Sequence, residues 1–423
     1  MMSFKQKTLF AAVASASALL AAGSANAVYV NNDGLGQALV YPYYTVRAGN
    51  TTLLSVVNTT DQAKAVKVRF LDGKNTAEVL DFNLFLSPKD VWTGAIMATA
   101  DGAMIATKDK SCTNPKLPAG GQPFRNFQFV EDGDVTALQA MDRTREGYVE
   151  ILEMATIPTT TALGKDVTHV SGTPKCSLTN DANATSATGL TAPSGGLFGS
   201  ESIVNFTSGY STSVDATALD GWHSGNFGIT ASGSLQPSIA SGGSTIAVVN
   251  NGGNVYVSQM VNSLDAVSAT MMHSNVMGEY AFTSDGAFGT DWVLTMPTKR
   301  QYVFDGNGSS NGGLGPFESA WSNKTGLSCD LVSLSSTDRE EYKGVTLDDF
   351  SPKPPGTPGN SLCYEANVIG FGAAADASAS AVLGSKNFVG ISPIQNAGVS
   401  PVPQGTEGGW LDLQFDTSVA AGR

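Results

Sequence analysis

Short runs in which apolar and polar residues alternate constrain the fold of this chain more than any other feature. In the run from 65 to 70, Val66, Val68 and Phe70 are separated by single basic residues. Successive side chains of a strand point to opposite faces of a sheet, so this run predicts a strand with one buried face and one face exposed to water. Comparable runs at intervals of about ten residues are typical of an antiparallel β-sandwich; they span 37–45, 52–58, 78–86 and 91–97.

The second half of the chain has the same character. Residues 245–249 and 254–261 flank Asn250-Asn251-Gly252-Gly253, whose residues tolerate the positive φ of a tight hairpin. Ser263 is placed to cap a short helix that continues to residue 274. Further strands are predicted at 147–155, 202–206, 291–296, 300–304, 365–371 and 410–415.

These elements divide the chain into four segments. Residues 1–27 form a leader, and residues 28–157 form an N-terminal β-sandwich domain of immunoglobulin-like kind. Residues 158–200 are rich in Thr, Ser, Ala and Gly, and we predict a long surface excursion there. Residues 201–423 form a C-terminal β-rich domain. The predicted fold is therefore mainly β, with two antiparallel β-sandwich-like domains, short helices and long loops tethered by disulfides.

The leader has the pattern of a signal peptide. Lys5 and Lys7 precede an apolar, Ala-rich run over 9–22, and Ala25-Asn26-Ala27 supplies the small residues that a signal peptidase requires. We predict cleavage after Ala27, so that the mature chain begins at Val28. The alternative, an uncleaved anchor, is disfavoured because the run is shorter than the ~20 residues that span a bilayer. The predicted location is extracellular or at the cell surface, with the periplasm as an alternative.

The four cysteines fit an oxidising compartment. None of them belongs to a C-x-x-C pair of the kind that binds zinc or carries out redox chemistry. Three pairings are open. We favour Cys112 with Cys176 and Cys329 with Cys363, because each pair brackets a turn-rich insertion. Free buried thiols are the alternative, which the export signal disfavours.

The charge is acidic and unevenly distributed. The chain has 24 Lys and Arg against 37 Asp and Glu, a net charge of -13, and no Lys or Arg between Lys175 and Lys299. A surface without cations cannot neutralise phosphates, so nucleic acid is excluded as a partner of this half, and anionic membranes are disfavoured. No segment after the leader has the continuous apolar run of a membrane helix, so we expect no transmembrane insertion of the mature chain.

Two motifs of enzyme chemistry are absent from the sequence. It has no phosphate-binding loop of the G-x-x-x-x-G-K-S/T type and no H-E-x-x-H zinc helix. The three histidines are His169, His223 and His273, and none has a recognisable partner in its local sequence. We therefore predict neither a Ser-His triad nor a zinc site.

Two carboxylate pairs are the remaining catalytic candidates, because a glycosidase needs only two acids across a cleft. Glu150 and Glu153 stand at odd spacing on a strand, which directs their side chains to opposite faces. Asp338, with Glu340 or Glu341, belongs to a charged run that is typical of a solvated loop. We assign no catalytic residue to the chain.

Calcium and sugar are the ligands that the sequence leaves open. Residues 305–312 place oxygen-bearing side chains at alternate positions but lack the glycine and closing glutamate of a calcium loop, and 131–134 is a second acidic turn. No cofactor is therefore predicted, with calcium as a minor alternative. Aromatic residues can stack on sugars, but we expect most of them in the core; they include Tyr41, Tyr43, Tyr44, Trp92, Trp222, Trp292, Trp321 and Trp410.

Three segments carry a resemblance to known sequences. They are 41–46, 80–88 together with Trp92, and 290–300. In these segments the chain resembles a group of exported bacterial proteins that are generally described as hypothetical or cell-surface proteins. The resemblance implies export and a bacterial source, and it carries no activity and no site residues.

The sequence favours a non-enzymatic secreted or cell-surface structural protein. Only 14% of the residues are charged, and Ser, Thr and Gly are abundant. This composition, together with unpaired edge strands, favours self-association by strand addition or surface presentation. The expected partners are therefore further copies of the chain or other surface proteins. An adhesin or carbohydrate-binding module is the first alternative, with glycans as partners. A secreted hydrolase that uses two carboxylates is the second.

Overall fold

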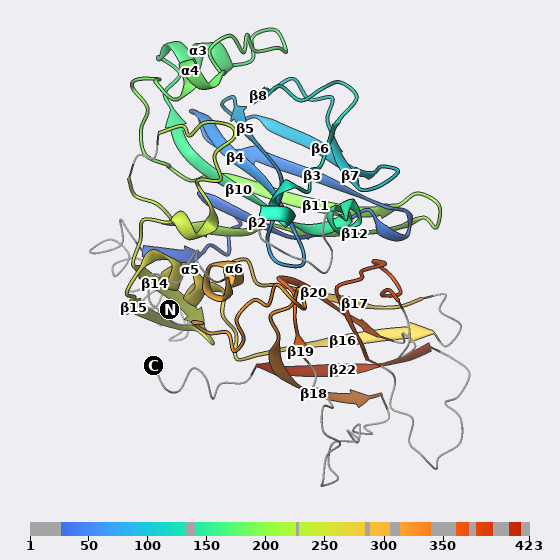
Figure 1. Cartoon of the computed structure of the whole chain (residues 1–423). Coiled ribbons are helices and arrows are strands. Elements are labelled where there is room, and N and C mark those ends of the chain that lie inside the picture. Colours follow the sequence, from blue (N-terminus) through green and yellow to red (C-terminus); the bar gives the residue numbers. More distant parts are fainter. Residues whose placement is uncertain are drawn as a thin grey trace, which may run out of the picture.

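The computed structural model describes residues 27–131, 140–225, 228–283, 288–304, 314–339, 361–371, 378–391 and 406–415. The strands of this part form four sheets, of nine, six, four and three strands, and the helices are few and short. The prediction of a mainly β protein is therefore confirmed. Figure 1 shows most strands of the two larger sheets in the upper part of the molecule and the two smaller sheets below them.

The nine-stranded sheet contains the N-terminal strand near one end. Its neighbours are antiparallel except for β1 and β14, which run parallel, so the sheet is not purely antiparallel. In spatial order its strands are β15 (Asn254–Gln259), β14 (Ile246–Asn251), β1 (Ala27–Val30), β13 (Thr217–Asp220), β2 (Ala38–Thr45), β10 (Glu146–Ile157), β4 (Ala63–Asp72), β5 (Glu78–Leu86) and β8 (Cys112–Asn114).

The six-stranded sheet packs on the nine-stranded sheet. Leu54, Val68 and Trp92 belong to one apolar cluster between them and are almost fully buried. Such burial of apolar side chains on facing strands is what holds a sandwich together. In spatial order the strands of this sheet are β12 (Tyr210–Asp215), β11 (Leu197–Asn205), β3 (Asn50–Asn58), β6 (Val91–Ala98), β7 (Ala103–Ala106) and β9 (Gln122–Pro123).

Strand β4 differs from the prediction in one respect. Every residue of the strand is buried, including Lys67 and Arg69, so the prediction that one face is exposed to water is wrong. The reason is a covering segment: the Lys67 Nζ donates to the carbonyl oxygens of Ala231 and Ser232. Lys67 also pairs with Asp81 at 2.6 Å. The basic residues of this strand are therefore buried ion-pair partners.

The two smaller sheets form the lower part of Figure 1. One contains β16 (Asn275–Thr283), β22 (Thr406–Phe415), β18 (Asp330–Asp338) and β19 (Ser361–Leu362) in that order. The other contains β17 (Asp291–Thr295), β20 (Ala366–Phe371) and β21 (Phe388–Ile391), and its β20 and β21 are parallel. A shared apolar cluster lies between them, in which the rings of Tyr280 and Phe371 stack at 4.5 Å.

The helices are short and lie in the connections. Two predictions about them are wrong. Residues 300–304 were predicted as a strand, but 300–303 belong to helix α6, because so short a run does not distinguish the two structures. Helix α5 is capped by the side chain of Asn262 rather than by Ser263 and ends at Met271. The helices are α2 (Phe127–Glu131), α3 (Ala162–Val167), α4 (Asp181–Ala184), α5 (Ser263–Met271) and α6 (Lys299–Val303), with 3-10 turns η1 (Arg47–Gly49), η2 (Met141–Arg145) and η3 (Ile239–Ser241).

The sheets do not change at residue 201, where we placed a domain boundary. Strands β11 to β15, which span 197–259, belong to the two larger sheets, in which β11, β13 and β14 pair with strands of the N-terminal part. The smaller sheets begin with β16 at Asn275. The segment 158–200 includes α3 and α4 and packs apolar residues such as Leu163 and Ala184 against β4 and β10. It therefore lies against the larger sheets over part of its length.

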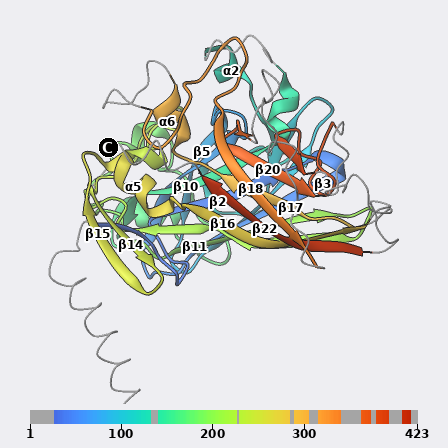
Figure 2. The same ribbon diagram turned by 90° about the horizontal axis from the view of Figure 1, so that it is seen from below.

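Buried polar contacts join the larger sheets to the smaller ones. The carboxylate of Glu146 accepts from Tyr43 Oη at 2.8 Å, from Arg47 Nε at 2.7 Å and from the hydroxyl of Ser385. On the other side of β10, Glu365 accepts from Thr76 Oγ1 at 2.6 Å. Figure 2 shows the smaller sheets seen from below, where they cover strands of the larger ones.

Candidate functional surface

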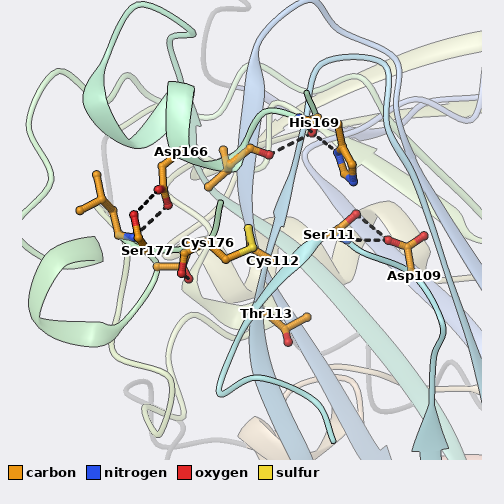
Figure 3. Close-up of a disulfide and its surroundings, with 12 residues drawn as sticks. Asp109, Ser111, Cys112, Thr113, Asp166, His169, Cys176 and Ser177 are labelled. Carbon is orange, nitrogen blue, oxygen red and sulfur yellow. Dashed lines mark hydrogen bonds between the residues drawn. A yellow bond between two sulfur atoms is a disulfide. The ribbon is translucent and has the colours of Figure 1, made fainter. Parts of the chain in front are cut away.

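Both favoured disulfides are present. Cys112 in β8 is bonded to Cys176, with their Cα atoms 5.4 Å apart, and Cys329 is bonded to Cys363 beside β18 and β19. None of the four cysteines is free. The first bond attaches the segment 158–200 to the end of the nine-stranded sheet (Figure 3). Both bonds therefore cross-link strands or loops, and none leaves a thiol for catalysis.

A Ser, a His and an Asp do meet beside this disulfide. The Nδ1 atom of His169 lies within hydrogen-bond distance of the Ser87 hydroxyl and 3.6 Å from Asp90 Oδ2. A triad needs the serine and the aspartate on opposite ring nitrogens, whereas both lie at the same nitrogen here. Ser87 is buried, and its hydroxyl donates to the carbonyl of Val167 at 3.0 Å. The cluster therefore closes a loop and does not activate a nucleophile.

The other two histidines do not belong to the cluster around His169. His223 is partly buried, which lowers the pKa of its imidazole. His273 is exposed and follows α5. In the part of the chain that the structure describes, no three side chains of His, Cys, Asp or Glu are grouped as a metal ion would require.

The carboxylates of β10 are occupied by buried cations. Glu150 pairs with Arg69 at 2.9 Å, and Glu153 pairs with Lys64 at 2.7 Å. Glu153 also accepts from the backbone N–H of Gly195 at 2.9 Å. Both glutamates are at most 1% exposed, so neither faces a cleft that a substrate could enter.

Three predicted acidic sites lie wholly or partly outside the described residues. Asp338 is the last residue of β18, but Glu340 and Glu341 are not described, and the same holds for 305–312. Within 131–134, only the backbone of Glu131 is described. These candidates for catalysis or calcium binding therefore stay predictions.

The predicted aromatic residues lie mostly in the core. Tyr41, Tyr43, Tyr44, Trp92 and Trp222 are at most 1% exposed, and Trp321 is 7% exposed. Trp222 donates its indole N–H to the carbonyl of Ile239. Only Trp410, at 38%, is among the large exposed apolar side chains. These residues therefore do not form a common platform for a sugar.

The ends of the two larger sheets differ in how they are protected. At one end lie β8, three residues long and bonded to Cys176, and β9, two residues long with Pro123 in it. Short strands, proline and a covering segment are the usual ways of blocking strand addition. Asn114 of β8 also donates to Asp181 in the covering segment at 2.6 Å. This end of the sandwich is closed.

The opposite end of the nine-stranded sheet is open. Its last strand, β15, has the sequence Asn-Val-Tyr-Val-Ser-Gln, and all six residues are exposed. Val255, Tyr256 and Val257 are 53%, 54% and 63% exposed. Valine and tyrosine are residues that strands favour. Strands β14 and β15 lie at the margin of the molecule in both views (Figures 1 and 2).

The local sequence explains why this hairpin forms. Asn251 pairs with Asn254, which leaves Gly252 and Gly253 as a two-residue loop. Their φ angles are +60° and +83°, and positive φ at both positions is what the favoured hairpin turns require. The predicted hairpin is confirmed. Helix α5 packs against β14 and β1, so it supports the inner strand and leaves the outer one uncovered.

Absence of charge distinguishes β15 from the other long edges. Among the described residues, the sheet edges of five residues or more are β12, β15, β16 and β17. The other three contain an acidic residue, namely Asp215, Glu279 and Asp291, whereas β15 contains none. Between Asp220 and Asp265 the sequence has no Asp, Glu, Lys or Arg at all. We call the hairpin 246–259 the edge hairpin and take it as the candidate functional surface.

The predicted cleavage site lies beside this surface in the same sheet. Residues 1–26 lie outside the described residues, while Ala27 and Val28 begin β1 and are 3% and 0% exposed. Strand β1 is paired with β13 on one side and β14 on the other. The edge hairpin is thus attached to the rest of the sheet through the strand that begins at the predicted cleavage site.

Comparisons with known proteins add no family to this description. No protein-family model matches the chain, and neither a curated protein nor a solved structure is similar to it. In the described part of the chain, the structure contains no helix with the length and apolar character to cross a membrane.

Proposed function

We propose that this protein is an exported, non-enzymatic structural protein that self-associates by adding β15 of one copy to β15 of another. The observation that carries the proposal is the uncharged strand at the open end of the nine-stranded sheet, in which all six residues are exposed. An edge strand presents unpaired N–H and C=O groups, which a second strand satisfies. Pairing two copies of β15 joins two nine-stranded sheets into one.

Charge favours β15 over the other edges as the contact. The chain carries a net charge of -13, so two copies repel each other over most of their surface. At β16 a two-fold antiparallel contact centred on the strand places Glu279 of one copy opposite Glu279 of the other, and at β12 it brings Asp215 of both copies into the contact. At β15 no such repulsion arises, because the edge hairpin has no charged side chain.

Export supports this function and is part of the proposal. The leader pattern and the two disulfides are consistent with an extracellular or cell-surface location. Cleavage after Ala27 precedes folding in this account, because the bond becomes buried once β1 is paired on both sides. The resemblance to exported bacterial proteins points the same way.

The test is the oligomeric state of the oxidised protein, exported with its own leader and studied by size-exclusion chromatography with light scattering. We expect a concentration-dependent dimer that Val257→Lys converts to a monomer, since a cation on the edge opposes strand addition. Val214→Lys on β12 is the matched control, because Val214 is also exposed, at 45%, on an edge strand. Loss of the dimer with Val214→Lys alone, or a wild-type monomer at all concentrations, would refute the proposal.

A further inference from the structure

A large cavity is lined by residues of the nine-stranded sheet and of the smaller sheets, beside the point where Thr295 Oγ1 of β17 donates to the carbonyl of Pro42 in β2. Its volume is about 810 Å³, within the range of roughly 300–1,000 Å³ that is typical of small-molecule sites. One wall is formed by Val30, Val40 and Pro42 of β1 and β2, and the other by β17, by the end of α5 and by Phe317. Met272 borders the cavity and is 49% exposed, so the cavity is open to solvent at that point.

Apolar side chains dominate the lining. The largest of them are Met271, Trp292, Leu294, Met296, Phe317 and Phe415. Methionine and aromatic side chains adapt to apolar ligands of irregular shape. The indole N–H of Trp292 donates to the carbonyl of Glu279 at 3.1 Å, so its orientation is fixed within the protein. The lining therefore suits a flexible hydrocarbon chain better than a polar metabolite.

The charged groups of the lining have one sign. Glu318 and Asp330 belong to it, and no Lys or Arg does. Asp330 is neutralised, since its Oδ2 lies 2.6 Å from Lys299 Nζ. Glu318 has no cation beside it among the described ion pairs, and its Oε2 accepts only a backbone N–H, from Leu331 at 3.2 Å. The cavity therefore carries an excess of one negative charge at this end.

We infer that this cavity binds a single-chain amphiphile whose head group is uncharged or cationic. The hydrocarbon chain lies along the apolar lining that includes Val30, Met271 and Leu294, where it is removed from water. The head group lies toward Glu318, which attracts a cation and repels an anion. This site is separate from the edge hairpin, so it is independent of the proposed self-association.

Three probes with the same chain test the inference: dodecyltrimethylammonium, dodecyl maltoside and dodecyl sulfate, each below its micellar concentration. Trp292 lines the cavity and reports binding through its fluorescence. We expect a saturable change with the first two probes and an affinity for dodecyl sulfate that is about tenfold lower or worse. Trp292→Phe removes this signal and identifies its source.

Variants then locate the site. Val276 of β16 and Val30 of β1 both line the cavity. Val276→Phe and Val30→Phe therefore fill it from different strands and are expected to abolish saturable binding, with circular dichroism to confirm folding. Glu318→Gln is expected to lower the affinity for the cationic probe several-fold relative to the maltoside. Its matched control is Glu279→Gln, an exposed glutamate outside the lining, which is expected to change neither affinity.

Three results overturn the inference. One is the absence of saturable binding for all three probes. Another is wild-type binding by a folded cavity-filling variant, which indicates adsorption elsewhere on the surface. The third is dodecyl sulfate binding as tightly as the cation. If both filling variants fail to fold, the affinity of the cationic probe is compared between Glu318→Gln and Glu279→Gln. Equal affinities in these two variants would reject the site.

Discussion

The two edge strands of the nine-stranded sheet, β8 and β15, differ in whether other residues protect them from strand addition. At the end formed by β8, a three-residue strand is bonded to Cys176 and contacts Asp181, so the backbone edge is covered. At the end formed by β15, six exposed residues have neither charge nor cover. A covalent bond and a segment of over forty residues protect one edge, while the other is unprotected. Because the same sheet has one covered edge and one uncovered edge, exposure of an edge strand is not general to this fold. It is specific to β15.

The largest expected effect on stability comes from removing the disulfide that covers the edge at β8. Replacing Cys112 and Cys176 by alanine removes a cross-link between residues 64 apart, which we expect to lower the free energy of unfolding by about 4 kcal/mol. Urea unfolding followed by circular dichroism measures this change. The variant is also expected to aggregate through β8. If its solubility and stability match those of the wild type, the disulfide does not protect this edge.

The next largest effect is a pH dependence of stability that arises from a buried carboxyl group inside the sandwich. Glu201 of β11 is 1% exposed and accepts from Tyr43 N at 3.1 Å, and its Oε2 has no hydrogen-bond partner among the described residues. Burial raises the pKa of the Glu201 carboxyl to about 8. The folded state therefore holds a proton that the unfolded state has lost, so this contribution to stability is complete below the pKa of the unfolded chain and falls as pH rises toward 8.

Glu201→Gln tests this pH dependence. We expect the wild type to lose on the order of 3 kcal/mol relative to the variant between about pH 5 and pH 9. Denaturant unfolding at several pH values gives the difference. Asp215→Asn, on the exposed neighbouring strand β12, is the matched control on an exposed carboxylate. Parallel profiles for wild type and Glu201→Gln would show that Glu201 is ionised in the fold.

A smaller effect is expected in the segment that covers β8. The Thr161 hydroxyl caps α3 by accepting from Gly164 N at 3.0 Å. Thr161→Ala should lower the free energy of unfolding by about 1 kcal/mol. Asn262→Ala, which removes the equivalent cap of α5 near the open end, provides the comparison. Thermal unfolding measures both, and an effect at α5 but none at α3 would mean that the covering segment adds no stability to the sheet.

The smallest effect on stability is expected at the open end itself. Val257 is 63% exposed, so Val257→Lys should change the free energy of unfolding by less than about 0.5 kcal/mol. The same substitution is expected to abolish the dimer. Equilibrium unfolding at a concentration where the protein is monomeric measures the first quantity. A loss of several kcal/mol would indicate that the edge hairpin is part of the core.

Local patterns in the sequence predicted the parts of the fold that local chemistry determines. The Gly252-Gly253 turn needs positive φ at both residues, and the hairpin around it was predicted correctly. Alternation identified β4 but not the burial of Lys67, because the covering residues Ala231 and Ser232 are distant in sequence. The helix at 299–303 was missed because its short run has no periodicity to read.

The candidate site was predictable only in part. Absence of Lys and Arg between 175 and 299 was visible in the sequence, but it argued only against nucleic acid and anionic membranes and did not identify a contact surface. Which strand lies at an edge depends on sheet order, and β1 separates β14 from β13 through pairings that no local pattern records. The apolar cavity likewise requires side chains from strands that are far apart in the sequence.

Hydrogen–deuterium exchange of the exported wild-type protein at low and high concentration tests the central claim most directly. Strand addition at β15 predicts that the amides of 254–259 become protected as concentration rises, while those of β12 at 210–215 keep the same exchange rate. Protection of β12 without protection of β15, or exchange at β15 that is independent of concentration while dimers form, would contradict the account.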